Sequence, residues 1–541
     1  MKTLSRYLSN PYLILFLGII CMSLGSAKWT ISIGPWLGLS FFLYFTRKVK
    51  LWKSFLFGLC GIFMANLIAV YDVFPAPFPI LIMILLIGSL KSILPYFIDR
   101  ITKASNYGFM GTLIFPAAFV SLEYFNTLDS GDVWSSIANT QYHFKAFQQI
   151  ASVFGIWGIT FLIAWFASLI NWMASLQWKW KALKSGTIIA GSIYLIIIVF
   201  GIARISKTDY TDSETVKIAG ITMNNSNLLE SIYQDEFGKS LEIPLEASQT
   251  DPKLQEANKA MVPFIENPFD KKFEKSLIVM NANLDHLFQK TAEIAEDGAK
   301  IVVWSEAIGF IINSQEDSVV ERAKTLARDK GIYLFMSLGV LNPGPINSNR
   351  LLLVNKIITV SPKGDAINEY LKSNPVPFVE QEYGSDDIIP VIESPYGNLS
   401  PIICYDADFP HFLKQTVKNK TDILMVPSGD WQAIDPYHGY MASLRGIENG
   451  ISVFRPVSRA VSIATDPYGN LLGSTDFYTS KDKILVARVP IQGIKTIYNH
   501  IGDLLPYLSI LLTFFMLLQR LYGVFRKKKT LHNENTSILE Y

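Results

Sequence analysis

Cysteine and charge are both scarce in this chain of 541 residues. Its three cysteines, Cys21, Cys60 and Cys404, are too few for a scaffold held together by disulfides. Charged residues make up 17% of the chain and the net charge is +2, so the basic excess of a nucleic-acid-binding surface is missing. The sequence also has no glycine-rich phosphate loop and no cluster of metal ligands. We therefore expect no nucleic acid partner, no cofactor and no metal.

Hydrophobic residues are abundant instead, at 50% of the chain, and they are gathered in long runs. A helix that crosses a bilayer needs about 20 apolar residues. Eight runs approach that length, at about 10–27, 30–46, 53–71, 75–97, 107–125, 150–174, 185–205 and 502–523. The pattern predicts a seven-span domain in residues 1–212, a polar domain in residues 213–495, and a closing helix with a basic tail in residues 496–541.

Lysine and arginine are concentrated in alternate loops, and positively charged loops stay in the cytoplasm. The basic clusters lie at residues 47–53, 100–103, 179–184 and 526–529. This distribution predicts that both termini are cytoplasmic and that residues 213–495 face outward. A cleavable signal at the N-terminus is an alternative, because Lys2 and Arg6 precede an apolar stretch, but its removal would leave the remaining topology unchanged.

The outward domain alternates short apolar runs with helical patterns, which indicates layers of sheet and helix. Strands are predicted at 216–222, 300–304, 332–339, 351–360, 399–404, 422–428 and 461–465, and helices at 273–298, 316–330 and 436–449. Residues 223–272 have no clear period and are too long for a passive connection. They form either a lid, a surface loop or a membrane-facing loop, in which Met261, Val262, Phe264 and Phe269 would enter lipid.

Three reactive side chains follow predicted strands, where α/β sheets collect functional groups. Glu306 lies in "VVWSEAIG", Lys372 in "EYLKSNPVPF" and Cys404 in "SPIICYDADFP". Each alone has an ordinary structural explanation: a charge at a helix N-terminus, a solvated lysine and a packed thiol. An acid, an amine and a thiol at three strand ends predict one shared pocket.

The order and context of these residues resemble the Glu–Lys–Cys triad of the nitrilase, or carbon–nitrogen hydrolase, superfamily. With the predicted spans included, the chain resembles the apolipoprotein N-acyltransferase family over nearly its whole length. The resemblance implies an αββα catalytic domain outside the cytoplasmic (inner) membrane of a bacterium. It also implies supporting roles for Glu380, Tyr405, Asp406 and Trp431, with Glu382 as an alternative to Glu380.

The sequence departs from that family at several positions. Ser305 stands where the family usually has proline, and Asp406 stands where the transferases often have glutamate. The stretch "SGDWQAI" replaces the common "NDAWF" and keeps Asp430 and Trp431. These changes leave the scaffold and triad intact but leave the acyl acceptor open.

The chemistry can also be argued from the residues. Glu306 can take the proton of the Cys404 thiol, and Lys372 with a backbone N–H beside Cys404 can stabilise an oxyanion. A thioester on Cys404 results. The resemblance implies that a phospholipid donates the acyl chain and that the α-amine of a diacylglyceryl-cysteine on a lipoprotein accepts it.

Three other functional hypotheses remain open from the sequence. A membrane-tethered amidase or nitrilase would share the triad and use water as acceptor. A sensor or scaffold would keep the fold without the chemistry. A papain-like pair of Cys404 with His411 or His438 would replace Glu306 as the base.

Overall fold

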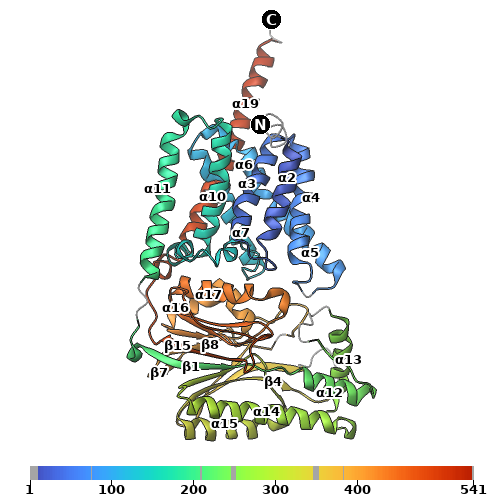
Figure 1. Ribbon diagram of the computed structural model, residues 1–541. Coiled ribbons are helices and arrows are strands. Elements are labelled where there is room, and N and C mark those ends of the chain that lie inside the picture. Colours follow the sequence, from blue (N-terminus) through green and yellow to red (C-terminus); the bar gives the residue numbers. More distant parts are fainter. Residues whose placement is uncertain are drawn as a thin grey trace.

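The computed structural model describes residues 10–74, 76–206, 210–244, 251–344, 352–381 and 383–538. Figure 1 shows a bundle of helices stacked on an α/β domain, with α16 and α17 of that domain between its sheets and the bundle. The chain runs through the bundle first, then through the α/β domain, and returns to the bundle in its last helix. Residues far apart in sequence therefore form one helical unit.

The bundle is built from apolar helices of unequal length. They are α2 (Pro11–Leu24), α3 (Ile33–Lys48), α4 (Leu51–Val70), α5 (Phe78–Ser92), α6 (Leu94–Ile101), α7 (Ile114–Asp129), α8 (Lys145–Gln148), α9 (Ala151–Phe154), α10 (Ile156–Ser175), α11 (Trp180–Ile205) and α19 (Leu504–Ile538). Among the described residues, five helical segments are long and apolar enough to cross a membrane: 51–70, 78–101, 156–175, 180–205 and 504–524.

Three of the eight predicted spans form shorter helices. The α2, α3 and α7 helices have 14, 16 and 16 residues. Proline and glycine explain the shortening of α2, which begins at Pro11 and is capped by Gly25. The run that was predicted from residue 107 starts with a 3₁₀ turn, Met110–Leu113, before α7 begins. For these three segments, membrane crossing stays a prediction.

Burial in the bundle separates central from peripheral helices. In the apolar stretch of α10, 78% of the residues are buried, whereas in that of α11 only 17% are buried. The outer face of α11 is therefore exposed and suited to contact with lipid. A buried carboxylate inside the bundle is paired: Glu123 accepts hydrogen bonds from the Thr160 hydroxyl at 2.7 Å and the Ile137 amide at 3.1 Å. This pairing is required where water cannot compensate a buried polar group.

The α/β domain contains two large sheets. The first follows the order β15-β1-β2-β4-β5-β6, with β3 also paired to β4, and the second follows β14-β13-β11-β9-β8-β7. The strands of the first are β1 (Thr215–Ile221), β2 (Ile301–Trp304), β3 (Gly309–Ile312), β4 (Tyr333–Leu341), β5 (Leu353–Val360), β6 (Ala366–Leu371) and β15 (Ile484–Pro490). Those of the second are β7 (Ile392–Ser394), β8 (Gly397–Pro401), β9 (Ile423–Met425), β11 (Ser452–Arg455), β13 (Val461–Thr465) and β14 (Leu471–Asp476). A short pair, β10 (Ser428–Gly429) and β12 (Val457–Ser458), lies beside them.

Helices cover both outer faces, which gives four layers and confirms the predicted αββα class. Side chains of the two sheets, such as Val303 and Phe454, share one core. The α14 (Glu274–Glu296) and α15 (Glu316–Lys330) helices cover the first sheet, and α16 (Pro410–Lys418) and α17 (Tyr437–Asn449) lie on the side of the bundle. Met441 and Leu444 of α17 belong to the core of the bundle, so this helix joins the two parts.

Residues 223–272 are more regular than their sequence indicates. They contain α12 (Ser226–Phe237) and α13 (Pro252–Glu266). Phe264 is fully buried against other residues of the protein, so the expectation that it enters lipid is wrong. The reason is that α12 and α13 bury their apolar faces against each other and the start of α14. Val262 and Phe269 remain exposed.

Close helix packing gives a first prediction. A methyl group on Gly201 of α11 would overlap the carbonyl oxygen of Ala146, whereas one on Gly191 of the same helix would meet nothing within 4 Å. Gly201→Ala should therefore lower the melting temperature of the protein in detergent. Gly191→Ala is the matched control and should leave that temperature unchanged or raise it, since alanine favours helix by about 1 kcal/mol. Equal melting temperatures for both variants would contradict the packing described.

Candidate active site

Strand ends bring Glu306, Lys372 and Cys404 together, as the sequence predicts. Glu306 follows β2, Lys372 follows β6, and Cys404 follows β8 and opens a 3₁₀ turn, Cys404–Asp408. Cys404 has a φ of +48°, a left-handed conformation that a residue with a side chain adopts only when its surroundings enforce it. Its amide donates to the carbonyl of Pro427 at 3.0 Å, which ties the strained residue to the end of β9.

A buried ammonium between two carboxylates forms the centre of the site. Lys372 Nζ lies 2.8 Å from Glu306 Oε1 and 2.6 Å from Glu380 Oε2. The lysine side chain is only 1% exposed. Burial by itself lowers the pKa of Lys372, but the charges of Glu306 and Glu380 outweigh it and raise that pKa well above its usual value. Lys372 is therefore a fixed positive charge.

Hydrogen bonds to the backbone and to an amide side chain fix both carboxylates. Asn355 Nδ2 donates to Glu306 at 2.8 Å and to Glu380 at 3.2 Å. The amide of Gly429 donates to Glu306 Oε2 at 2.7 Å, and that of Val376 donates to Glu380 Oε2 at 2.7 Å. Glu382 lies outside the described residues, so the structure describes only Glu380 in this position.

The Cys404 thiol is buried on the other side of Gly429. Its Sγ lies 3.9 Å from the carbonyl oxygen of Gly429 and 3.8 Å from Asp430 Oδ1. Burial, followed by the negative charge of Glu306, raises the pKa of the thiol well above its usual value, although Lys372 acts in the opposite direction. The thiol therefore keeps its proton at rest, and nucleophilic attack requires a base nearby.

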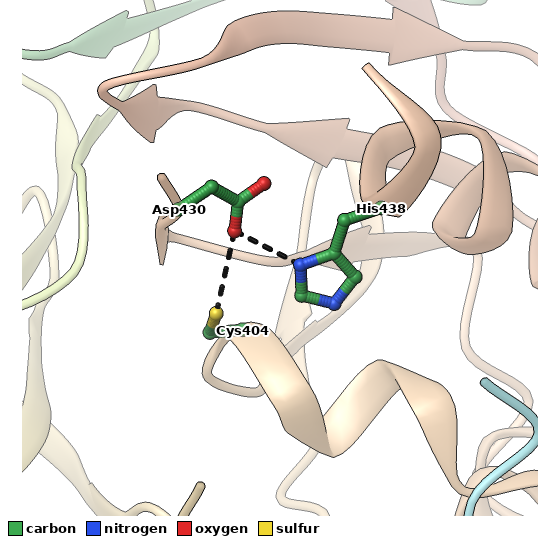
Figure 2. A group of neighbouring side chains, drawn as sticks. All are labelled: Cys404, Asp430 and His438. Carbon is green, nitrogen blue, oxygen red and sulfur yellow. Dashed lines mark hydrogen bonds and ion pairs between the residues drawn. The ribbon is translucent and has the colours of Figure 1, made fainter. Parts of the chain in front are cut away.

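A second charged group lies next to the thiol. Figure 2 shows Asp430 between Cys404 and His438. His438 Nδ1 lies 2.9 Å from Asp430, and its Nε2 lies 3.2 Å from Asp408. Arg455 Nη2 donates to both oxygens of Asp430 at 3.0 Å. Burial raises the pKa of Asp430, but Arg455 and His438 outweigh it and lower that pKa to about 2.

This arrangement fits neither a metal site nor a papain-like pair. Cys404, Asp430 and His438 offer ligand atoms within 4.8 Å of one another, but the Arg455 guanidinium between them repels a cation. Both ring nitrogens of His438 face carboxylates, and Nδ1 also lies 2.9 Å from Arg455 Nη2. The pKa of His438, which burial lowers, is raised to about 9 by Asp408 and Asp430. A protonated, paired His438 is a poor base, and His411 lies instead beside Lys414 and the ring of Tyr124.

The predicted supporting residues fall into two groups. Asp406 lies within the catalytic domain and accepts hydrogen bonds from Tyr370, the Ile403 amide and Asn374 at 2.7–3.0 Å. Tyr405 and Trp431 reach the bundle instead. The Tyr405 hydroxyl donates to Asp132 at 2.7 Å, and Trp431 Nε1 donates to the carbonyl of Val73 at 3.0 Å.

Sequence patterns did not single out Asn355, Arg455 and Asp132 as site residues. Asn355 lies inside β5 and Arg455 is the last residue of β11, and the sequence does not show that both are buried. A polar residue within or at the end of an apolar run is the signal that could have identified them. Asp132 follows α7 and offered no such signal, because its partner Tyr405 is far away in sequence.

The comparisons with known proteins agree with this architecture. A model described as carbon-nitrogen hydrolase matches residues 279–498, and one described as the apolipoprotein N-acyltransferase N-terminal domain matches residues 19–169. Apolipoprotein N-acyltransferase 1 of Treponema denticola is 23% identical, covering 96% of this chain and 98% of that protein. Apolipoprotein N-acyltransferase of Haemophilus influenzae is 24% identical, covering 74% and 72%. A crystal structure of an amidase from Nesterenkonia sp. is 20% identical over 53% of this chain and 94% of its own, with a TM-score of 0.34.

Each matched region corresponds to one part of the fold. Residues 19–169 lie in the helical bundle, and residues 279–498 make up most of the α/β domain. The two-sheet part is thus a carbon–nitrogen hydrolase domain that is carried on a bundle of membrane helices. The bundle matches the transferase model separately, and relatives with one name extend across both parts. The chain belongs to the apolipoprotein N-acyltransferase family.

The charge network around His438 predicts a pH dependence of stability. The pKa of His438 is raised from 6.5 to about 9 in the folded protein, so its contribution is complete below pH 6.5 and is lost as the pH rises through 9. Such a shift corresponds to at most about 3 kcal/mol. The melting temperature should fall across this range in the wild type, and His438→Gln should be less stable at pH 6 with a flatter profile.

His411→Gln provides the control for that measurement. The pKa of His411 is lowered by burial and by Lys414, so its titration affects stability below pH 6.5 and leaves the alkaline slope in place. An unchanged slope in His438→Gln would show that His438 is not the group that titrates.

Proposed function

We propose that this protein is an N-acyltransferase of a bacterial cytoplasmic membrane. It moves an acyl chain from a phospholipid, through a thioester on Cys404, to the α-amine of a diacylglyceryl-cysteine on a lipoprotein. The observation that carries the proposal is the buried Cys404, next to a Lys372 ammonium and the Glu306 carboxylate, on a turn that the membrane bundle contacts directly. The names of the relatives support the choice of substrates.

The first step is thioester formation. Glu306 takes the proton of the Cys404 thiol, and the sulfur attacks the ester carbonyl of the phospholipid. A C–S bond forms, the C–O ester bond breaks, and the leaving lysophospholipid alkoxide takes the proton back from Glu306. Lys372 stabilises the oxyanion that forms in between, and one such preorganised donor contributes about 3 kcal/mol.

The second step uses the same groups in a new order. The acceptor amine attacks the thioester carbonyl and gives a proton to Glu306 as the C–N bond forms. The C–S bond breaks, and the sulfur leaves as a thiolate that Glu306 reprotonates. An amine competes with water for the thioester, so the acceptor that reaches Glu306 decides between transfer and hydrolysis.

Access for a lipid donor is supported by apolar residues between the site and the bundle. Phe378 is 56% exposed, and its ring lies 6.2 Å from that of Phe74, in the connection between α4 and α5. Val379 is exposed next to Glu380. These side chains form an apolar edge where an acyl chain can leave the bilayer and approach the carboxylate pair.

The nucleophile can be tested by separating the two steps. Cys404→Ser nearly preserves volume but replaces the thiol by a hydroxyl that is far harder to ionise. With phospholipid vesicles alone, wild-type protein should gain a hydroxylamine-labile acyl group by mass spectrometry. Cys404→Ser and Glu306→Gln should gain none. Cys60→Ser, in the bundle, is the control and should load normally. Loading of Cys404→Ser at the wild-type rate would remove Cys404 from the mechanism.

The proposed orientation has its own test. The distribution of lysine and arginine predicts that residues 213–495 lie outside the cytoplasm. Alkaline phosphatase fused at residue 240 should be active and green fluorescent protein at the same position dark, while fusions after residue 530 should show the reverse. Fluorescence at residue 240 would overturn the orientation and the access of a secreted lipoprotein.

A further inference from the structure

A cavity of about 220 Å³ adjoins Glu306 on the side of α12 and α13. Its wall combines apolar side chains with polar groups. The apolar ones include Leu229, Ile243 and Leu254, and the polar ones include Asn225, Ser226, Ser458 and Arg459. Cys404 and Lys372 do not line it. The cavity therefore adjoins Glu306, the general base, and not Cys404, the nucleophile.

From this position we infer that the cavity binds the first peptide residue that follows the modified cysteine of the acceptor. This inference rests on the proposed transfer reaction and names the part of the substrate that reaches this site. In the second step the acceptor amine must give its proton to Glu306. The group bonded next to that amine then lies beside Glu306, which is where the cavity opens.

The polar wall suits a peptide bond. Asn225 Nδ2 donates to the carbonyl of Ile308 at 3.1 Å, while its buried Oδ1 has no hydrogen-bond partner among the described residues. A buried acceptor without a donor costs about 1–3 kcal/mol, which a ligand N–H recovers on binding. The side chains of Asn225 and Ile308 both line the cavity. A peptide amide supplies such an N–H.

The cavity of about 220 Å³ is small beside the lipid portions of both substrates. A small residue fits it better than an acyl chain or a diacylglyceryl group. Figure 1 shows α12 farther from the bundle than α17. An acceptor whose lipid remains in the bilayer would extend its peptide in this direction.

Arg459 lines the cavity, and its positive charge has two consequences. A nearby positive charge disfavours protonation of an amine, which keeps the acceptor nucleophilic. The same charge would also suit the phosphate of a phospholipid headgroup. A headgroup would occupy the cavity during the first step and a peptide during the second, so measuring the steps separately distinguishes them.

Filling the cavity provides the test. Leu229→Trp places a larger side chain in the wall, and Gln234→Trp, on the exposed side of the same helix, is the matched control. With vesicles of phosphatidylethanolamine, wild type, Leu229→Trp and Gln234→Trp should all form the acyl thioester at the same rate. On addition of a diacylglyceryl-cysteine peptide, Leu229→Trp should transfer the chain about tenfold more slowly or worse, and the control normally.

Acceptor peptides with residues of different size provide a test that does not depend on correct folding of Leu229→Trp. A peptide with tryptophan after the modified cysteine should react more slowly with wild type than one with serine or glycine. Leu229→Ala should restore part of that rate, and a gain of activity cannot arise from damage. Equal rates for all three peptides in wild type would overturn the inference.

The remaining outcomes are equally distinct. If Leu229→Trp slows thioester formation as much as transfer, the cavity binds the donor headgroup and the inference is wrong. If it slows neither, the cavity is not used. If wild type forms no thioester with phospholipid at all, the proposed function itself fails, and this result is independent of any cavity variant.

Discussion

The ion pairs of Lys372 with Glu306 and Glu380 are the interaction on which the rest of the site depends. An ammonium removed from water costs several kcal/mol unless opposite charges and hydrogen bonds replace the solvent. Here two carboxylates do so, and Asn355 and two backbone amides hold the carboxylates in turn. Asn355 lies in β5, Glu306 and Lys372 follow β2 and β6, and Glu380 lies in the segment after β6, so the first sheet positions most of these charges before any substrate binds. The second sheet positions the Cys404 thiol beside these charges, whose places are already fixed.

Charge balance also explains why the site has two separate networks. Glu306 and Lys372 lie on one side of Gly429, and Asp430, His438 and Arg455 lie on the other. The Asp430 carboxylate by itself would oppose ionisation of the nearby thiol. Arg455 offsets that charge by donating to both oxygens of Asp430. The thiol therefore lies between the Lys372 network, which has two carboxylates for one ammonium, and the Asp430 carboxylate, whose charge Arg455 offsets.

Sequence patterns predicted the layered class and the three central residues for identifiable physical reasons. Strands such as β2 and β4 are uniformly buried and have apolar sequences, and Glu306 and Cys404 follow apolar runs of this kind, whereas Lys372 follows the more polar strand β6. The short strands and the helices α12 and α13 were not predicted. Their apolar residues are buried by contacts between these segments, and no regular hydrophobic pattern within each segment indicates this burial. The Tyr405–Asp132 contact joins residues that are 273 positions apart, which no local pattern contains. Helix lengths also depend on capping and packing, which an apolar run does not show. Among the described residues, five of the eight expected spans are long enough to cross a membrane as a helix.

The attachment of the nucleophile turn to the bundle has a geometric consequence. Tyr405 bonds to Asp132, and the amide of Val133 donates to the carbonyl of Asp408 at 3.0 Å, so both ends of the turn are tied to the same connection after α7. Trp431 makes a third attachment at Val73. Three attachments around one sulfur atom fix its distance from the bundle and not only its orientation. If the proposed function holds, a lipid ester bond would react only at the depth in the lipid layer at which it meets this sulfur.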